Sequence, residues 1–421
     1  MDSAHHTITI TCHCNAAKQV LTPRNTQDVF SNLSLCHCDS CRHSTGLLCT
    51  SYTPISSPPS TTGLESYSVS PASTRYFCST CGCHIFRTRH PSPTAPSEEW
   101  KWEVATGTII DAPAPSRLPE TSHHQHTNAT NDGGLSHWLQ ALQPSHDTNS
   151  PPPPDENNND TLRASCHCTS ITLLITRASP SPLNPNSPYP DLLLPYTATP
   201  LPTILNASHE KWYLRPTNTS IHTNTEANSS SILSPPQANN AHAHIPYRYL
   251  AGTCACQPCR LTSGFEIQTW AFIPRRNIAI RGSSSSSSSV PAAPSPLFPP
   301  PSPPPSGLNH ATYQPLDFSH LPAGVPLKEY DSSPGRAREF CAVCGATVFW
   351  HDTFRPDLID VSAGLFRAEE GARAEHWLEW WTERVSFSEE AGKGRAGGAK
   401  VWGEEVIAAL EGGMRGPHRQ G

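Results

Sequence analysis

The chain has 421 residues, which leaves room for two ordinary domains and additional unstructured length. Its net charge is -6, from 29 basic and 35 acidic residues, and no basic stripe is visible. This balance argues against a nucleic-acid partner. The 45 prolines and the low charged fraction of 15% indicate long stretches of low-complexity polar sequence.

The sequence also predicts the compartment of the protein. The first thirty residues lack the basic start and apolar core of a secretion signal. No stretch approaches the roughly 20 apolar residues that cross a bilayer, so we expect no membrane partner. We expect a cytoplasmic protein, with the nucleus as the alternative. Closely spaced cysteines in such a reducing compartment favour metal ligands over disulfides.

The N-terminal part carries seven cysteines in three groups. Residues 7–11 are rich in β-branched side chains, predict a strand, and lead directly into the first group. The groups have the spacings CxC, CxCxxC and CxxCG, and they are Cys12 and Cys14, then Cys36, Cys38 and Cys41, then Cys78 and Cys81. Side chains two apart on a strand point to the same face, so each CxC pair can share one ion. A short helix is predicted at 135–142.

The same order of spacings recurs after a proline-rich linker at 143–161. Its groups are Cys166 and Cys168, then Cys254, Cys256 and Cys259, then Cys341 and Cys344. The sequence Arg75-Tyr76-Phe77 leads into the first CxxCG, and Arg338-Glu339-Phe340 leads into the second. Short strands are predicted at 171–176, 212–214, 269–273, 347–350 and 358–361. A repeated order of spacings and flanking residues indicates two copies of one fold.

The second copy is longer than the first between its cysteine groups. The extra sequence, at about 179–240 and 282–318, is rich in Ser, Asn and Pro, and we expect it to form disordered insertions. Trp377, Leu378 and Trp381 have helical spacing and predict a helix at 373–384. We assign 1–142 to the first domain, 162–395 to the second and 396–421 to a C-terminal tail, in which 404–410 predicts a weakly anchored helix.

The cysteine groups predict two kinds of metal site. The CxC and CxxCG groups of each copy supply four thiolates, the ligand count of a closed structural zinc site. The central CxCxxC group supplies three, which leaves a fourth position for water or substrate, as in catalytic zinc sites. The alternative is a second closed site, in which His13, His37 or His43 completes the first copy. Arg42 and Arg260 follow the last central cysteine and are candidates to bind a substrate carboxylate, with an ordinary supporting role as the alternative.

The central groups also carry a family resemblance. The two segments concerned are Cys36-His37-Cys38-Asp39-Ser40-Cys41-Arg42 with Gly46, and Cys254-Ala255-Cys256-Gln257-Pro258-Cys259-Arg260 with Gly264. Both resemble the signature of the glutathione-dependent formaldehyde-activating enzymes, a family that also contains centromere protein V. The flanking CxC and Phe-Cys-x-x-Cys-Gly complete that pattern in both copies. The resemblance implies a mainly β chain of two tandem β-tent domains, each with two zinc ions, one structural and one catalytic. A short helix is expected to end each domain.

The resemblance further implies a carbon–sulfur lyase that condenses glutathione, as co-substrate, with formaldehyde. We therefore expect an enzyme that acts on a small-molecule thiol and aldehyde, with the six central cysteines at the catalytic ions. The alternative is a non-catalytic zinc module that binds protein partners through the Pro/Ser-rich segments. Chromatin association, suggested by the centromere-protein branch, is disfavoured because the sequence has no basic surface.

Overall fold

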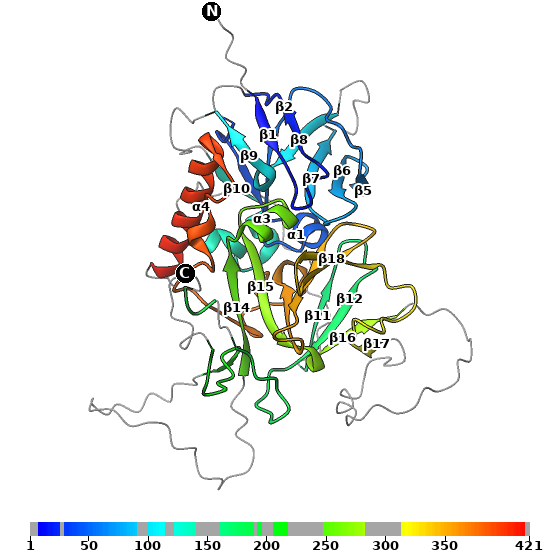
Figure 1. Ribbon diagram of the computed structural model, residues 1–421, viewed down its shortest axis with the longest axis vertical. Coiled ribbons are helices and arrows are strands. Elements are labelled where there is room, and N and C mark those ends of the chain that lie inside the picture. The colour runs from blue at the N-terminus through cyan, green and yellow to red at the C-terminus, as the bar shows by residue number, and fades with distance from the viewer. Residues whose placement is uncertain are drawn as a thin grey trace, which may run out of the picture.

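The computed structural model of the protein describes most of both predicted domains, drawn in colour in Figure 1. The described residues are 7–25, 29–90, 100–113, 122–139, 160–188, 192–195, 205–217, 247–282 and 313–416. Most of the predicted linker and of the two predicted insertions lies outside them. Within the described residues, no helix combines the length and the hydropathy needed to span a bilayer.

The first copy is built from two sheets. The smaller has the strand order β2-β1-β9, with β2 at Gln19–Leu21, β1 at Ile8–Ile10 and β9 at Ile109–Ala112. The larger has the order β10-β3-β4-β8-β7-β6-β5, with bounds His123–Gln125, Ser34–Cys36, Thr50–Pro54, Lys101–Ala105, His84–Arg89, Ser73–Cys78 and Leu64–Ser70. Its short helices are α1 (Asp39–Thr45), η1 (Thr106–Thr108), η2 (Thr127–Thr130) and η3 (Gly134–His137).

The second copy repeats this architecture. One sheet has the order β11-β12-β16-β17, with bounds Thr161–Ser165, Thr172–Thr176, Ile278–Arg281 and Tyr313–Pro315. The other has the order β13-β14-β15-β21-β20-β19-β18, with bounds Leu214–Pro216, Tyr247–Cys254, Gln268–Pro274, Leu358–Ser362, Thr347–Asp352, Arg336–Cys341 and Leu327–Ser333. Its short helices are α3 (Gln257–Ser263), η4 (Arg275–Asn277), η6 (Ala363–Leu365) and η7 (Ser388–Glu390).

The strand orders confirm the mainly β prediction, and they are similar in the two copies. From β3 to β5 the first copy reads β3-β4-β8-β7-β6-β5, and the second reads β14-β15-β21-β20-β19-β18, which is the same path through equivalent strands. Each copy has its own apolar core. Three residues of the first predicted insertion, Trp212, Tyr213 and Leu214, belong to the second core, where the Trp212 ring lies 5.0 Å from that of Phe272.

The two copies contact each other through equivalent elements. The amide of Gly364 in η6 donates to the carbonyl of Gly46, which ends α1, at 3.2 Å. In the mirrored contact the amide of Gly107 in η1 donates to the carbonyl of Gly264, which ends α3, at 3.0 Å. Figure 1 shows α1 and α3 near the middle of the molecule, between the sheets of the two copies. The copies therefore form an internal pair with approximate two-fold symmetry.

The glycines that end α1 and α3 are required by this contact. Gly46 and Gly264 adopt φ angles of 82° and 88°, a region that favours glycine. A Cβ on Gly46 would lie 2.2 Å from the carbonyl oxygen of Thr347, and one on Gly264 would lie 2.1 Å from that of His84. Any side chain at either position would force the copies apart.

The helix predicted at 373–384 is wrong. This segment instead contains β22 (Leu378–Trp380), which pairs in parallel with β14 at the edge of the large sheet. Ala374 has a φ of 50°, which interrupts helical geometry just before the strand. The tryptophans of this segment do not form one helix face. The Trp377 ring instead contacts a cation, since the guanidinium of Arg177 lies 3.5 Å from its centre. The helix predicted at 135–142 is also wrong in type, because its described residues form the single 3₁₀ turn η3.

The C-terminal segment forms an anchored helix instead of a tail. The helix α4 spans Gly397–Arg415, and Figure 1 shows it in red against the strands of the first copy. Residues Ala396 and Gly397 bridge to β9, and the buried ring of Trp402 stacks on Phe30 with 5.5 Å between centroids. Leu410 is fully buried in the same core. The end of the chain therefore completes the hydrophobic core of the first copy.

Candidate metal centres

The outer cysteines of the first copy converge as predicted. Cys12 and Cys14 follow β1, and Cys78 and Cys81 lie at the end of β6 and in the turn after it. Their four sulfurs lie within 4.8 Å of one another, with 3.5 Å between Cys12 and Cys14 and 3.4 Å between Cys14 and Cys78. Four sulfurs bound to one zinc at about 2.3 Å each would lie about 3.8 Å apart. The set therefore fits a tetrahedral zinc ion, and none of its cysteines is in a disulfide.

The outer cysteines of the second copy form the same arrangement. Their sulfurs lie 3.4 Å apart between Cys166 and Cys168 and 3.6 Å apart between Cys168 and Cys341, and Cys344 completes the group. The amide of Ile171 points at the Cys166 sulfur at 3.4 Å, which stabilises a thiolate there. These contacts fit a second structural zinc.

Each outer site is tied to the opposite copy by a tyrosine. The ring of His13, between Cys12 and Cys14, hydrogen-bonds the hydroxyl of Tyr330 at 2.8 Å. The ring of His167, between the equivalent cysteines, hydrogen-bonds the hydroxyl of Tyr67 at 2.7 Å. Loss of an outer metal ion should therefore also disturb the interface between the copies.

The central cysteines form two groups of three. In the first copy the Cys41 sulfur lies 3.3 Å from that of Cys36, and Cys36 lies 3.5 Å from Cys38. In each copy the first ligand ends a strand, the second caps a helix and the third lies in its first turn. Among the described residues, neither triad gathers a fourth histidine, cysteine or carboxylate ligand. Both triads fit a zinc ion with one coordination position open to other ligands.

The histidines considered as closing ligands have other surroundings. The Nε2 atom of His37 lies 2.9 Å from Nδ1 of His124, and His124 in turn contacts the carbonyl of Leu139. His13 contacts Tyr330, and His43 is buried outside the triad. Burial lowers the pKa of both His37 and His43 well below the usual value, so both rings are neutral. The structure thus favours the open form of the central site.

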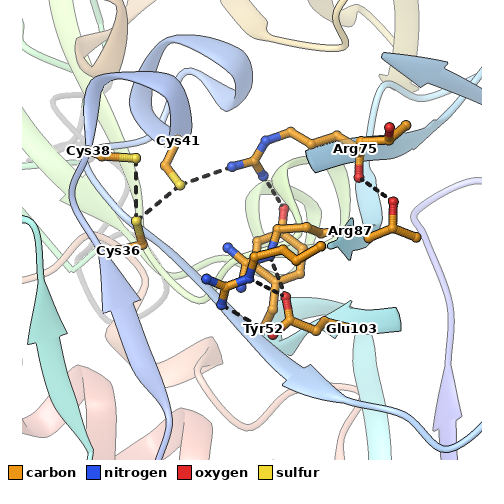
Figure 2. A network of polar contacts seen from close by, with 10 residues as sticks. Cys36, Cys38, Cys41, Tyr52, Arg75, Arg87 and Glu103 are labelled. Carbon is orange, nitrogen blue, oxygen red and sulfur yellow. Dashed lines mark hydrogen bonds and ion pairs between the residues drawn. The ribbon is translucent and has the colours of Figure 1, made fainter. Parts of the chain in front are cut away.

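A buried arginine contacts each central triad. In the first copy the Nη2 atom of Arg75 donates to the Cys41 sulfur at 3.0 Å, as Figure 2 shows. In the second copy Nη2 of Arg338 donates to the Cys259 sulfur at 3.4 Å. Hydrogen bonds from the two neighbouring cysteines lower the pKa of Cys41 and of Cys259 well below the usual range, and the arginine charge lowers each further. The surroundings of each triad therefore favour the thiolate form of its last cysteine.

Side chains fill the space beside the first triad. The Nη1 atom of Arg75 donates to the hydroxyl of Tyr52 at 2.6 Å, and the Arg87 guanidinium lies 4.2 Å from the centre of the Tyr52 ring. Arg87 also donates to Glu103 at 2.6 Å. All four side chains are buried, and Figure 2 shows them as one polar cluster next to Cys41. The first triad is therefore enclosed on this side.

The equivalent positions of the second copy carry different residues. In the strand register, Tyr52 of β4 lies opposite the last residue of β8, and Trp270 of β15 lies opposite the last residue of β21, so the two positions are equivalent. Likewise, Arg87 of β7 lies opposite Glu103 of β8, and Trp350 of β20 lies opposite Asp360 of β21, so Arg87 and Trp350 are equivalent. Two tryptophans thus replace the tyrosine and the arginine that enclose the first triad.

A cavity of about 440 Å³ opens at the second triad as a result. Its wall includes Cys254, Cys256, Cys259, Trp270, Trp350 and Arg338. Trp270 has no acceptor to offer the arginine, so Nε and Nη1 of Arg338 are buried without a partner among the described residues. Unpaired buried donors are costly, which makes Arg338 ready to bind an oxygen atom of a ligand.

The two arginines predicted to bind substrate have structural contacts. Arg42 is buried and paired with Asp39. Arg260 donates to the carbonyl oxygens of Gly107 at 2.7 Å and Lys393 at 3.0 Å, so it ties α3 to the first copy. Neither lines the cavity. These contacts favour the supporting role that was the alternative for both.

The sequence does contain one signal for the arginine that contacts each central triad. Arg75 and Arg338 each stand three residues before the CxxC group of their copy, and this recurrence could have identified them. The cavity residues Trp270 and Trp350 gave no such signal, because they are what differs between the copies.

Comparison with known proteins agrees with the geometry of the first copy. Residues 7–123 match the family described as glutathione-dependent formaldehyde-activating enzyme. No curated protein and no solved structure matches the chain. The second copy lies outside the matched range, and its relation to the first rests on the repeated cysteine groups and strand order.

Proposed function

Because residues 7–123 match the family described as glutathione-dependent formaldehyde-activating enzyme, we propose that this zinc protein is a carbon–sulfur lyase-type enzyme. Its substrates are a thiol, with glutathione as the first candidate, and an aldehyde. The reaction takes place at Cys254, Cys256 and Cys259 of the second copy. The observation that carries the proposal is the cavity at this triad, which gives small molecules access to the cysteine sulfurs.

The three thiolates would hold the catalytic zinc ion. A zinc ion in such a site keeps a bound thiol ionised and polarises a carbonyl oxygen. The negative charge of the thiolates and the positive charge of Arg338 also determine the electrostatic potential at the reacting atoms. Burial alone lowers the pKa of Arg338, but the Cys259 and Cys256 thiolates raise it above the usual value, so the guanidinium stays charged.

Arg338 stabilises the charge that develops during the reaction. When the thiol sulfur attacks the aldehyde carbon, a carbon–sulfur bond forms and the carbonyl electron pair moves to oxygen. The Nε and Nη1 donors of Arg338 can bind that oxygen in the buried cavity, where such hydrogen bonds are strong. The proton lost by the thiol passes to solvent, and the oxygen takes up a proton to give the thiohemiacetal. The reverse sequence cleaves the adduct.

We assign a structural role to the first central triad. The buried Tyr52, Arg87 and Glu103 side chains occupy the positions that form the cavity wall in the second copy. The Nη1 atom of Arg75 is already bound to Tyr52, and its Nη2 atom is bound to the Cys41 sulfur. A zinc ion held by Cys36, Cys38 and Cys41 would therefore stabilise the fold of the first copy.

The test compares equivalent cysteines of the two copies. Zinc-loaded protein is incubated with glutathione and formaldehyde, and adduct formation is followed by NMR. We expect Cys259→Ser to abolish catalysis and Cys41→Ser to retain it. Equal loss in both variants would contradict the division of roles. No turnover by the wild-type protein with any aldehyde, together with zinc that resists millimolar thiol, would favour the alternative of a non-catalytic protein-interaction module.

A further inference from the structure

We infer that the second central site selects adducts in which the carbon bonded to sulfur carries an apolar, preferably aromatic, group. The substrate aldehyde would then be an aromatic or bulky apolar aldehyde, whereas formaldehyde offers the cavity no side group to bind. This inference rests on the proposed function and names the substrate class of the same site.

Aromatic side chains surround the reactive sulfurs. Cys254 and Cys259 form one apolar cluster with Trp270, and Trp350 and Phe387 pack against it. Trp270 is only 5% exposed, so its ring is a fixed part of the wall. A group attached next to the bound sulfur would meet these rings first. Aromatic rings favour contact with other rings at their faces and edges.

Four of the seven charged side chains that line the cavity are paired with one another. Arg355 donates to both carboxylate oxygens of Asp360, at 2.7 and 3.1 Å. Lys393 lies 2.7 Å from Glu390. A charged side group on the aldehyde carbon would have to compete with these pairs, while an apolar side group would not. The unpartnered donors of Arg338 then need only one acceptor, which the adduct oxygen supplies.

An exposed aromatic ring also lines the cavity. Phe354, one of the lining residues, is 59% exposed, although most large apolar side chains of this chain are buried. An exposed ring at the edge of a pocket is typical of a site that binds apolar ligands. The volume of about 440 Å³ also suits a molecule with a ring.

The two copies provide an internal comparison for this inference. Tyr52 and Arg87 make a polar, filled environment in the first copy. Trp270 and Trp350 occupy the equivalent strand positions and give the second copy an apolar, open one. The change in chemistry coincides with the appearance of the cavity. It therefore marks the second site as one adapted to a different occupant.

Thiol binding tests the inference without turnover. Benzyl mercaptan carries a phenyl ring on the carbon bonded to sulfur, and 2-mercaptoethanol carries a polar group there. Affinities of the zinc-loaded full chain are measured by titration calorimetry, with zinc content determined for every sample. We expect the wild-type protein to bind benzyl mercaptan about three- to tenfold more tightly than 2-mercaptoethanol, since one ring–ring contact contributes about that much.

Two variants of Trp350 and one control variant test whether the cavity wall causes this preference. Trp350→Ala should weaken benzyl mercaptan binding by about three- to tenfold and leave 2-mercaptoethanol binding unchanged, and Trp350→Phe should restore the preference. Trp102→Ala is the matched control, because Trp102 is a half-buried tryptophan in the first copy, with its ring tilted against that of Tyr76. It should change neither affinity.

The outcomes distinguish the inference from the proposed function. Equal affinity for the two thiols, or an unchanged preference in Trp350→Ala, would overturn the apolar specificity and leave the thiol site intact. Failure of both thiols to bind the zinc-loaded wild-type protein would overturn the proposed function and this inference with it.

Discussion

A buried ion pair joins the C-terminal segment to both copies, and its removal should destabilise the whole molecule. Arg395 donates to Glu266 of the second copy at 2.7 Å, and both side chains are almost fully buried, at 0% and 1% exposed. The same guanidinium donates to the carbonyl of Thr106 in the first copy, whose hydroxyl donates to the other oxygen of Glu266 at 2.8 Å. The pair therefore links three parts of the chain that are distant in sequence.

The substitution Glu266→Gln keeps the shape of the side chain and removes its charge. The Arg395 charge then remains buried without its counter-ion, a change that typically costs about 3 kcal/mol of unfolding free energy. The matched control is Glu404→Gln, because Glu404 forms an exposed pair with Lys400 at 3.8 Å on α4. An exposed pair of this spacing contributes at most about 0.5 kcal/mol.

Urea unfolding of the zinc-loaded protein, followed by tryptophan fluorescence, measures both effects. The double variant Glu266→Gln/Arg395→Met should recover most of the lost stability, since it leaves no unpaired charge. If Glu266→Gln costs no more than Glu404→Gln, the three segments are not joined by this pair and the described link is refuted.

Three further predictions follow from the sites. Cys344→Ser should lose one zinc ion per chain by elemental analysis and lower the urea midpoint, because a closed structural site contributes folding free energy; full zinc retention would contradict this assignment. Arg338→Met should lower kcat/KM by about 10²- to 10³-fold but change benzyl mercaptan affinity little, since that thiol has no oxygen to bind. Parallel losses in both quantities would instead indicate a general disturbance of the triad. Burial lowers the pKa of His84 to about 3, from 6.5. The unfolded chain therefore takes up a proton near pH 6.5 that the folded chain does not, and acidification from pH 7 to 5.5 should cost about 1 kcal/mol at this residue. Unfolding of His84→Gln at both pH values should show a correspondingly smaller loss, and an identical loss would disprove the attribution.

The metal sites were predictable because cysteine spacing carries most of their geometry. The outer CxC groups were expected on strands but lie in the turns after β1 and β11, where their sulfurs still converge, and the later CxxC group closes the set. Strands predicted from β-branched residues at 171–176, 269–273 and 358–361 match β12, β15 and β21. In these segments local preference and tertiary packing agree.

The missed features depend on contacts between distant parts of the chain. The helix predicted at 373–384 fails because β14 offers a strand edge to Leu378, and tertiary pairing outweighs helical spacing. The anchoring of α4 depends on the Phe30 ring, which lies far away in sequence. Trp270 and Trp350 become equivalent to Tyr52 and Arg87 only when the strand register is known.

The most direct test of the central claim is a crystal structure of the zinc-loaded protein with bound benzyl mercaptan. We predict a zinc ion held by Cys254, Cys256 and Cys259, the thiol sulfur as its fourth ligand, and the phenyl ring against Trp350. A zinc ion at this triad closed by a fourth protein side chain, or the thiol bound at Cys36, Cys38 and Cys41 instead, would contradict the account.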